Sequence, residues 1–264
     1  NDFYRDFLDS RMQYSSGIFE NADDSLEMAQ QRKIDRIVDR IRIKPSDHVL
    51  EVGCGWGGLA IAIVKATGCR WTGLTISKAQ YEFAKSWVQK EGLEDKIEIL
   101  LQDYREHQGE YEKIVSIEML EAVGHEFFDS YFSSLDRLLK KDGLVFLQVI
   151  SIPDQRYDEY RWRTDWIQKY IFPGGLLPSL TALTQSMTRA SNFVVEQLEN
   201  IGPSYAETLK HWRERIDHGQ KKAAFDDRFY KMWQYYLTFC EASFDSRYLN
   251  DLQIVLTRPR NQKL

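Results

Sequence analysis

Apolar residues near the start of the chain recur with the period of a helix. Between residues 24 and 42 they are spaced three and four positions apart, at Ile34, Ile37, Val38 and Ile41. This spacing places them on one face of an amphipathic helix. Asp24 and Glu27 have the spacing of a capping pair at a helix start. We therefore expect a helix over 24–42 that buries one face.

Further along, short apolar segments alternate with helical segments. Ser77 is a predicted N-cap with Gln80 in the capping-box position, and Lys140, Lys141 and Gly143 indicate a helix end. The predicted strands are 48–52, 69–76, 96–103, 113–120, 144–151 and 248–259, and the predicted helices between them are 59–68, 77–92 and 126–141. This alternation predicts an α/β, Rossmann-like fold with a doubly wound, mostly parallel sheet. The nearly continuous apolar strands fit a sheet that is covered on both faces.

Residues 153–183 interrupt this alternation with aromatic and charged side chains and a turn at 173–175. Insertions of this length in compact domains usually serve a function. We expect 153–183 to be a helical insertion covering the active face of the sheet. Two further helices, predicted at 205–219 and 226–243, are expected to complete this cover.

Length and charge narrow the class of protein. The 264 residues contain no internal repeat and fit one large α/β domain over 1–264. Lys and Arg number 35 against 40 Asp and Glu, so the net charge is −5. This balance lacks the basic field of a nucleic-acid-binding protein, so we expect no nucleic-acid partner.

Cysteine usage and hydropathy add two further expectations. Cys54, Cys69 and Cys240 are an odd number without metal-ligand spacing, which predicts no metal site, no disulfide framework and a reducing compartment. No apolar run approaches the roughly 20 residues of a transmembrane helix, and no signal-peptide pattern opens the sequence. Any membrane contact is therefore expected to be peripheral.

Four glycines follow the first predicted strand, in the segment LEVGCGWGGLAI. Glycine lets the backbone turn sharply and lets a ligand approach the main chain closely. Gly53, Gly55 and Gly58 also have the G-x-G-x-x-G spacing of dinucleotide-binding turns. The carboxylate of Glu51, just before them, would repel a pyrophosphate and suits a cationic or hydrogen-bonding ligand. It therefore favours S-adenosylmethionine, while a glycine-rich turn without a ligand remains the alternative.

Several segments carry a resemblance to a known family. They are NDFYRDFLDSRMQYSSGIF, VLEVGCGWGGLAI, GLTISKAQ, LLQDYRE, VSIEMLEAVG, WIQKYIFPGGLLPS and NIGPSYAETLKHW. With them the chain resembles the cyclopropane fatty acid synthase family of S-adenosylmethionine-dependent methyltransferases over essentially its whole length. Family members usually carry more sequence before NDFY. We therefore expect one class I methyltransferase catalytic domain here, with no separate N-terminal domain.

The resemblance implies a reaction on lipid. The methyl group of S-adenosylmethionine adds to the cis double bond of an unsaturated acyl chain on a phospholipid, and a carbocation forms. A bicarbonate ion in the pocket removes a proton from the added methyl group, and a cyclopropane ring closes. The resemblance also implies a cytoplasmic enzyme that associates peripherally with the bilayer surface.

The resemblance assigns the bicarbonate site to five positions. Glu121 accepts a hydrogen bond from the bicarbonate hydroxyl, Tyr205 donates one, and Ile150 offers only its main chain. Ser16 lies where many bacterial members have cysteine, and Gln148 where many have histidine. Glutamine does not take a proton at neutral pH. These two departures leave open whether the pocket holds bicarbonate or another base.

The resemblance also implies a set of cofactor contacts. They are Tyr14, Ser15, Gly53, Gly55, Thr75, Ile76, Gln80 and Ile117. Gln80 has a second interpretation as part of a capping box. Glu118, three residues before Glu121, is interpreted as structural or close to the cofactor.

Two segments are candidates for contact with a bilayer. One is a compact apolar cluster in the insertion, formed by Tyr170, Ile171, Phe172, Leu176 and Leu177. Its alternative is ordinary cover for the core. The other is a small basic tail of Arg258, Arg260 and Lys263, which suits anionic lipid. Its alternative is a solvated chain end.

Other functions stay open at this point. Methyl transfer without ring closure would give methyl- or methylene-branched acyl chains. N-methylation of a bulky amine is a second alternative, although relatives of that kind favour a Glu–His pair where this chain has Glu121 and Ala122. A cofactor-binding scaffold without catalysis is a third, and the intact glycine segment argues against it.

Overall fold

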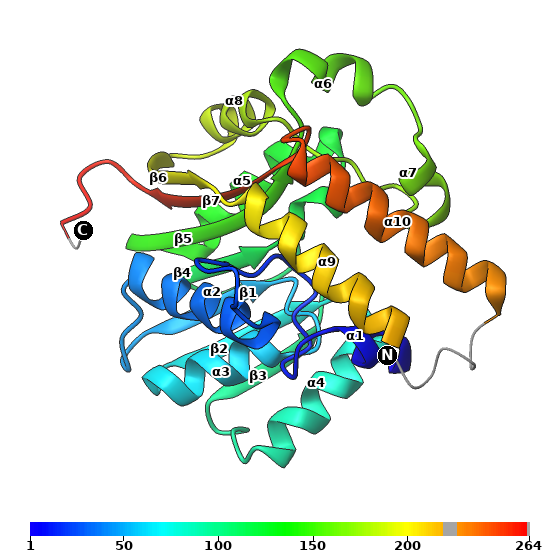
Figure 1. Ribbon diagram of the computed structural model, residues 1–264. Helices are drawn as coiled ribbons and strands as arrows, with labels where there is room; N and C mark the ends of the chain where they lie inside the picture. The colour runs from blue at the N-terminus through cyan, green and yellow to red at the C-terminus, as the bar shows by residue number, and fades with distance from the viewer. Residues whose placement is uncertain (219–225, 263–264) are drawn as a thin grey trace.

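A seven-stranded sheet forms the centre of the computed structural model, which describes residues 1–218 and 226–262. Its strands are β1 (His48–Val52), β2 (Arg70–Thr75), β3 (Ile97–Leu101), β4 (Tyr111–Ile117), β5 (Leu139–Ser151), β6 (Val194–Asn200) and β7 (Asn250–Thr257). They lie in the order β3-β2-β1-β4-β5-β7-β6 (Figure 1). The strands β1 to β5 pair in parallel, and β7 pairs antiparallel with both β5 and β6. The predicted doubly wound, mostly parallel sheet is confirmed.

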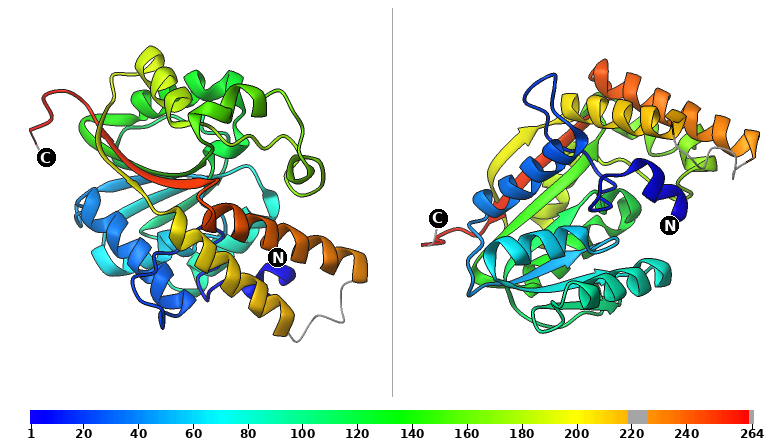
Figure 2. Two further views of the ribbon diagram at one scale, coloured as in Figure 1. Left: turned by 45° about the horizontal axis from the view of Figure 1, so that its top comes forward. Right: turned by 60° about the horizontal axis from the view of Figure 1, so that its bottom comes forward.

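Helices cover both faces of this sheet (Figure 2). One face packs against α2 (Leu26–Arg40), α3 (Gly58–Thr67) and α4 (Lys78–Lys90), and the other against α5 (Phe128–Leu138) and α8 (Leu180–Ala190). The remaining helices are α1 (Asp2–Phe7), α6 (Asp154–Tyr160), α7 (Trp166–Tyr170), α9 (Gly202–His218) and α10 (Asp227–Asp245). The helices α9 and α10 run side by side, and α1 packs against α9 (Figure 1). Because both faces are covered, the central strands are apolar almost throughout.

The first predicted helix begins later than its capping pair indicated. Ser25 is the N-cap of α2, and its side chain accepts a hydrogen bond from the main-chain nitrogen of Met28. Asp24 instead accepts bonds from the main-chain nitrogens of Glu20 and Asn21 and pairs with Arg32. The predicted pairing of Asp24 with Glu27 is therefore wrong, because a preceding turn uses the Asp24 carboxylate.

The helix predicted over 126–141 ends early. Its regular part is α5, and β5 starts directly at Leu139, so Lys140 and Lys141 belong to a strand rather than a helix stop. The strand predicted over 113–120 ends at Ile117, because the backbone turns at Glu118 with a left-handed φ of 48°. The helix α1, most of α8 and the strand β6 are not predicted. The edge strand β6 is largely exposed and therefore has no apolar face to reveal it.

The insertion at 153–183 is helical only in part. It contains α6, α7 and the first residues of α8, and 171–179 has no regular secondary structure. In this insertion, the ring centroid of Phe172 lies 6.4 Å from that of Tyr14 and 5.8 Å from that of Tyr236. The insertion thus packs over the opening segment of the chain. The last residue of the helix predicted over 205–219 lies outside the described residues.

No helix among the described residues combines the length and the apolar composition needed to cross a membrane.

Candidate active site

The predicted site residues gather at the carboxyl ends of the parallel strands. The strand order reverses direction between β1 and β4, and open α/β sheets bind ligands at such a switch point. Gly53 follows β1, Ile76 follows β2, Glu118 follows β4, and Ile150 lies near the end of β5. The topology therefore explains why residues far apart in the sequence share one edge of the sheet.

The glycine turn has the backbone that its sequence predicts. Gly53 and Gly55 both have positive φ angles, of 86° and 53°, which favour glycine over other residues. A Cβ atom on Gly55 would meet no atom within 4 Å, whereas one on Gly58 would lie 1.8 Å from the main-chain oxygen of Arg11. Gly58 thus lets the opening segment of the chain pack directly on the start of α3. Gly55 leaves its side of the turn open to a ligand.

Tyr14 and Ser15 are anchored in this opening segment. The ring of Tyr14 stacks on Trp212, with centroids 5.2 Å apart, and its hydroxyl lies 3.3 Å from that of Tyr236. The hydroxyl of Ser15 accepts a hydrogen bond of 2.6 Å from Nζ of Lys33. The segment is therefore fixed by contacts with α2, α9 and α10.

Thr75 and Gln80 are joined at the end of β2. The hydroxyl of Thr75 donates to Oε1 of Gln80 at 2.9 Å and accepts from the main-chain nitrogen of Ser77 at 3.1 Å. Ser77 is the N-cap of α4, as predicted, but the amide of Gln80 bonds to Thr75 instead of completing a capping box. Ile76 is 80% exposed and Ile117 is half-buried. These positions line the edge of the sheet beside the glycine turn.

Glu51 does not face a ligand. It is buried, and its Oε2 accepts a hydrogen bond of 2.9 Å from the indole nitrogen of Trp71. Burial raises its pKa to about 8, so the carboxyl is largely neutral at pH 7. The prediction that its charge selects a cationic ligand is wrong, because the side chain binds within the core.

Glu118 accepts hydrogen bonds from three separate parts of the chain. Its Oε2 accepts one of 2.6 Å from the hydroxyl of Tyr205 on α9. Its Oε1 accepts one of 2.9 Å from the main-chain nitrogen of Ser16 and one of 2.8 Å from Nε2 of Gln148. Burial raises the pKa of Glu118, and the three donors oppose that effect because they favour the ionised form. Sequence reasoning gave this residue only a supporting place, and the structure puts it at the centre of the site.

Gln148 extends this network across the sheet. Its Nε2 also lies 3.0 Å from Oδ2 of Asp251, and its Oε1 accepts a bond of 2.9 Å from Nε2 of Gln253. Asp251 is fully buried, and burial raises its pKa well above the ordinary value. Asp251 and Gln253 are not predicted from sequence. Their alternation on β7 with apolar neighbours is the available signal, since polar side chains are rare inside a buried strand.

Glu121 lies in a short 3₁₀ turn, Leu120–Ala122, after β4. Its Oε1 accepts a bond of 2.5 Å from the main-chain nitrogen of Ile150, and its main-chain oxygen accepts one of 2.8 Å from Leu176. Its Oε2 is buried and has no partner within the described part of the chain. Burial, followed by the nearby Glu118 charge, raises the pKa of Glu121 to about 8. Glu121 thus links the site to the insertion and carries a proton at neutral pH.

Lys33 is a further residue that the sequence analysis did not identify. It is fully buried on α2, and burial lowers its pKa to about 8, against the attraction of Glu118 and other carboxylates. It is therefore largely protonated at pH 7 and supplies a positive charge to the site. Its signal in the sequence is a charged residue one turn before Ile37, inside an apolar helical face.

Of the groups that the resemblance assigns to bicarbonate, only Oε2 of Glu121 has no partner within the described residues, and the others are engaged within the protein. Tyr205, Gln148 and the main chain of Ser16 all bind Glu118, and the hydroxyl of Ser16 donates to the main-chain oxygen of Gly17 at 2.9 Å. The residues present therefore do not fit an added bicarbonate ion.

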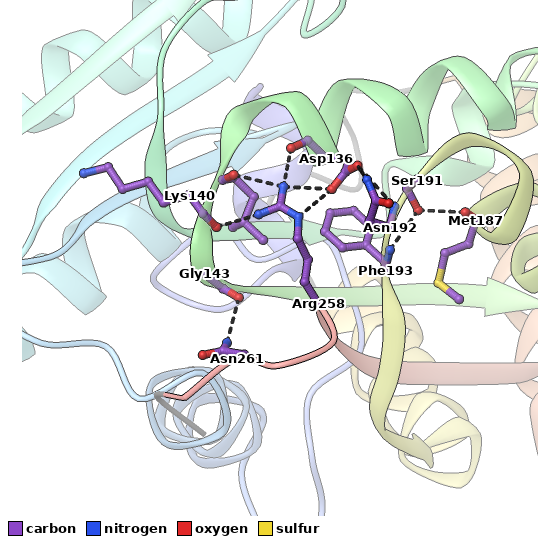
Figure 3. Close-up of polar contacts among 10 residues, drawn as sticks. Asp136, Lys140, Gly143, Met187, Ser191, Asn192, Phe193, Arg258 and Asn261 are labelled. Carbon is purple, nitrogen blue, oxygen red and sulfur yellow. Dashed lines mark hydrogen bonds and ion pairs between the residues drawn. The ribbon is translucent and has the colours of Figure 1, made fainter.

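Each of the two predicted lipid-contact segments has both exposed and at least partly buried residues. Leu176 is buried, whereas Tyr170 and Phe172 are 49% and 39% exposed. Arg258 is not free for lipid, because its guanidinium pairs with Asp136 and donates to the main-chain oxygen of Lys140 at 2.7 Å (Figure 3). The prediction of lipid contact is wrong for Arg258, since it binds the end of α5.

Arg260 and Lys263 are the other two residues of the predicted basic tail. Arg260 is exposed, and Lys263 lies outside the described residues.

Several known proteins are similar to this chain in sequence. Residues 1–254 match the family model described as mycolic acid cyclopropane synthetase. The chain is 40% identical to tuberculostearic acid methyltransferase UfaA1 of Mycobacterium tuberculosis, over 98% of this chain and 62% of that protein. It is 38% identical to cyclopropane-fatty-acyl-phospholipid synthase of Escherichia coli K12, over 98% of this chain and 65% of that protein. The chain thus spans less than two thirds of the length of these two relatives.

A solved structure agrees with the sequence matches. Mycolic acid cyclopropane synthase CmaA1, in a complex with SAH and CTAB, superimposes with a TM-score of 0.89 at 31% identity, over 97% of this chain and 94% of that one. The predicted class I methyltransferase fold is thereby confirmed. The resemblance seen in the sequence is confirmed as well, and the chain belongs to the mycolic acid cyclopropane synthetase family.

Proposed function

We propose that this chain transfers a methyl group from S-adenosylmethionine to the cis double bond of an unsaturated acyl chain on a phospholipid. The observation that carries the proposal is the network of acids at the carboxyl edge of the sheet, beside the glycine turn. Glu118 is held there by Tyr205, Ser16 and Gln148, with Glu121 close by. An alkene is a poor nucleophile that leaves a cation after methylation, so an acid–base group held in a site closed off from water suits its chemistry.

The cofactor part of the proposal rests on the glycine turn and its neighbours. When bound, S-adenosylmethionine supplies an electrophilic methyl group. The open side of Gly55 and the exposed side chain of Ile76 are suited to receive it. The other residues proposed to hold it are Tyr14, Ser15, Gly53, Thr75, Gln80 and Ile117.

Aromatic side chains around the site support a reaction that must exclude water. Tyr14 lies between Trp212 and Phe172, and Tyr236 contacts Phe172 in turn. A carbocation in contact with loose water would be trapped as an alcohol, so the pocket must be dry until the proton is lost. We assign this role to the aromatic cover.

Two products are candidates, and the relatives favour each of them. Ring closure gives a cyclopropane, in line with the name of the Escherichia coli relative. Branching gives a methyl- or methylene-substituted chain, in line with the name of the tuberculostearic acid methyltransferase. Both begin with the same methyl transfer, and they differ in the bond formed when the proton leaves.

We further propose that the enzyme works at the surface of a bilayer in the cytoplasm. An aromatic patch, defined by Tyr170, Phe172, Tyr235 and Phe239, is exposed on α7, α10 and the loop after α7. The ring of Trp166 connects its parts, 5.5 Å from Tyr170 and 4.7 Å from Tyr235. Tyrosine and tryptophan are favoured at membrane interfaces, because their side chains have both apolar and polar parts, and phenylalanine adds apolar area.

The test is incubation with S-adenosylmethionine and vesicles of monounsaturated phospholipid, followed by mass spectrometry of the acyl chains. The proposal expects each modified chain to gain one CH₂, and fragmentation then separates ring from branch. Methylation of an added amine, with unchanged acyl chains, would support N-methylation instead.

A further inference from the structure

The carboxylate of Glu118 lies where three hydrogen-bond donors converge. The donors are the hydroxyl of Tyr205 at 2.6 Å, the main-chain nitrogen of Ser16 at 2.9 Å and Nε2 of Gln148 at 2.8 Å. These groups come from α9, the opening segment and β5, so the fold has assembled them from distant parts of the chain. Three donors that converge on the two oxygens of one group form a site for a planar anion such as a carboxylate.

A carboxylate and bicarbonate present the same pair of oxygens to such donors. The resemblance to known sequences assigns Tyr205, Ser16 and Gln148 to a bicarbonate ion. In this chain they bind a side chain of the protein itself. The anion at this site is therefore the side chain of Glu118, which is part of the protein itself.

The backbone at Glu118 supports a specific role. Its φ of 48° lies in the left-handed region, which costs a residue with a Cβ atom roughly 1–2 kcal/mol relative to the usual conformation. A glycine would avoid this cost. Strain of this kind persists where the surrounding structure enforces it, and it clusters at functional sites.

The charges around Glu118 are consistent with one negative charge at this position. Glu121 and Asp251 are the neighbouring acids, and burial raises the pKa of each. Lys33 is the neighbouring cation, and it attracts Glu118. Glu118 is the acid of this group that binds three donors, so it is the one best stabilised when ionised.

We propose that Glu118 is the catalytic base of the reaction, in the place that bicarbonate takes in the resemblance. This inference rests on the proposed methyl transfer to an acyl double bond. The π electrons of the alkene form a bond to the incoming methyl carbon as its bond to sulfur breaks, and the other alkene carbon becomes a cation. Glu118 removes a proton from the new methyl group, and the released C–H electron pair closes the ring onto the cationic carbon. The proton on Glu118 passes to solvent between turnovers.

Three forms of the whole chain test the proposal: the unchanged protein, Glu118→Gly and Glu118→Gln. Each is assayed with S-adenosylmethionine and vesicles of monounsaturated phosphatidylethanolamine and phosphatidylglycerol, in buffer freed of carbon dioxide and again with millimolar bicarbonate. The unchanged protein should work equally well in both buffers. Glu118→Gly should lose activity by about 100-fold or more without bicarbonate and regain much of it when bicarbonate enters the space of the missing side chain. Glu118→Gln should lose activity in both buffers, because its amide fills that space without accepting a proton.

Binding of S-adenosylhomocysteine and the thermal midpoint check that the variants fold. Glu118→Gly should keep both, since glycine suits the left-handed backbone. If it does not fold, the isosteric Glu118→Gln still decides the matter. The proposal is wrong if the unchanged protein needs bicarbonate, if either Glu118 variant keeps full activity without it, or if Glu121→Gln alone abolishes turnover. If the unchanged protein modifies no acyl chain in either buffer, the proposed function itself fails, and the assignment of the base fails with it.

Discussion

The hydroxyl of Tyr205 donates a hydrogen bond of 2.6 Å to Oε2 of Glu118 and thereby joins α9 to the turn after β4. Tyr205 is only 5% exposed, and Glu118 is half-buried. A short bond between a phenol and a carboxylate fixes the direction of that carboxylate. The geometry of the site therefore depends on a contact between residues 87 positions apart in the chain.

Tyr205→Phe should lower turnover without unfolding the protein. The change removes one donor from Glu118, and a hydrogen bond to a charged group contributes about 1.5–3 kcal/mol. We expect kcat to fall by roughly 10- to 100-fold, while the dissociation constant for S-adenosylhomocysteine stays within about twofold. Steady-state kinetics and calorimetry measure the two effects. Unchanged kcat would show that the bond does not orient a reacting group.

Glu51→Gln should change how stability depends on pH. The folded-state pKa of Glu51 is raised to about 8 from an ordinary value of 4.5, so its contribution is fully present below pH 4.5 and is lost as the pH rises through 8. Glutamine stays neutral and removes this loss. Between pH 5 and pH 7.5, the free energy of unfolding of the variant should fall by about 3 kcal/mol less than that of the unchanged protein.

Denaturant titrations at the two pH values measure this difference. Glu121 has a similarly raised pKa, so the variant should keep part of the original dependence. Equal slopes in the two proteins would mean that Glu51 is ionised in the fold.

Gly58→Ala should displace the opening segment from α3. Its Cβ atom would lie 1.8 Å from the main-chain oxygen of Arg11, a distance that forces backbone to move. We expect a loss of more than about 2 kcal/mol in the free energy of unfolding, and weaker binding of S-adenosylhomocysteine. Gly92→Ala serves for comparison, because a Cβ atom added there would meet no atom within 4 Å, although the φ of 66° strains alanine. Gly58 does not have a left-handed φ, so a loss in Gly58→Ala no larger than that in Gly92→Ala would mean that the contact with Arg11 has little effect on stability.

Tyr235→Ser with Phe239→Ser should weaken binding to phospholipid vesicles. These two side chains are 52% and 46% exposed in the aromatic patch. Sedimentation with vesicles should show a loss of about tenfold or more in bound fraction, because each exposed aromatic buries apolar area on contact with lipid. Leu198→Ser, at a 43% exposed position on β6, serves as the control and should bind as before. An equal loss in the control would mean that the aromatic patch is not the site of contact with lipid.

Arg258→Ala should destabilise the fold and leave vesicle binding unchanged. Arg258 pairs with Asp136 on α5 and donates to the main-chain oxygens of Leu139 and Lys140 at the start of β5, and the side chains of Arg258 and Asp136 are largely buried (Figure 3). Removing the cation leaves those groups without their donor, at a cost of about 2–4 kcal/mol in the free energy of unfolding. The exposed Arg260, changed to Ala, should have little effect on stability. A loss of lipid affinity in Arg258→Ala alone would restore the basic tail as a membrane contact.

Much of the fold is predictable because its signals are local. The apolar strands, the glycine turn and the Ser77 N-cap each depend on a few adjacent residues, and the structure contains all of them. The edge strand β6 and the helix α8 lack so clear a pattern, and their positions depend on what they pack against.

The site is only partly predictable, because its contacts join residues that are far apart in the sequence. The resemblance brings Ser16, Gln148 and Tyr205 to one place, where the structure also puts them. That they converge on Glu118 does not follow from sequence, because it requires contacts between residues 102, 30 and 87 positions apart. Lys33 was detectable as a charge within an apolar stripe, but its partner Ser15 was not.

The most direct test of the account uses S-adenosylmethionine that carries three deuterium atoms on its methyl group, with vesicles of monounsaturated phospholipid and no bicarbonate. The account predicts modified acyl chains that keep two of the three deuterium atoms, because a base in the protein removes one from the new methyl group. Acyl chains that stay unmodified under these conditions, or that keep all three deuterium atoms, would contradict it.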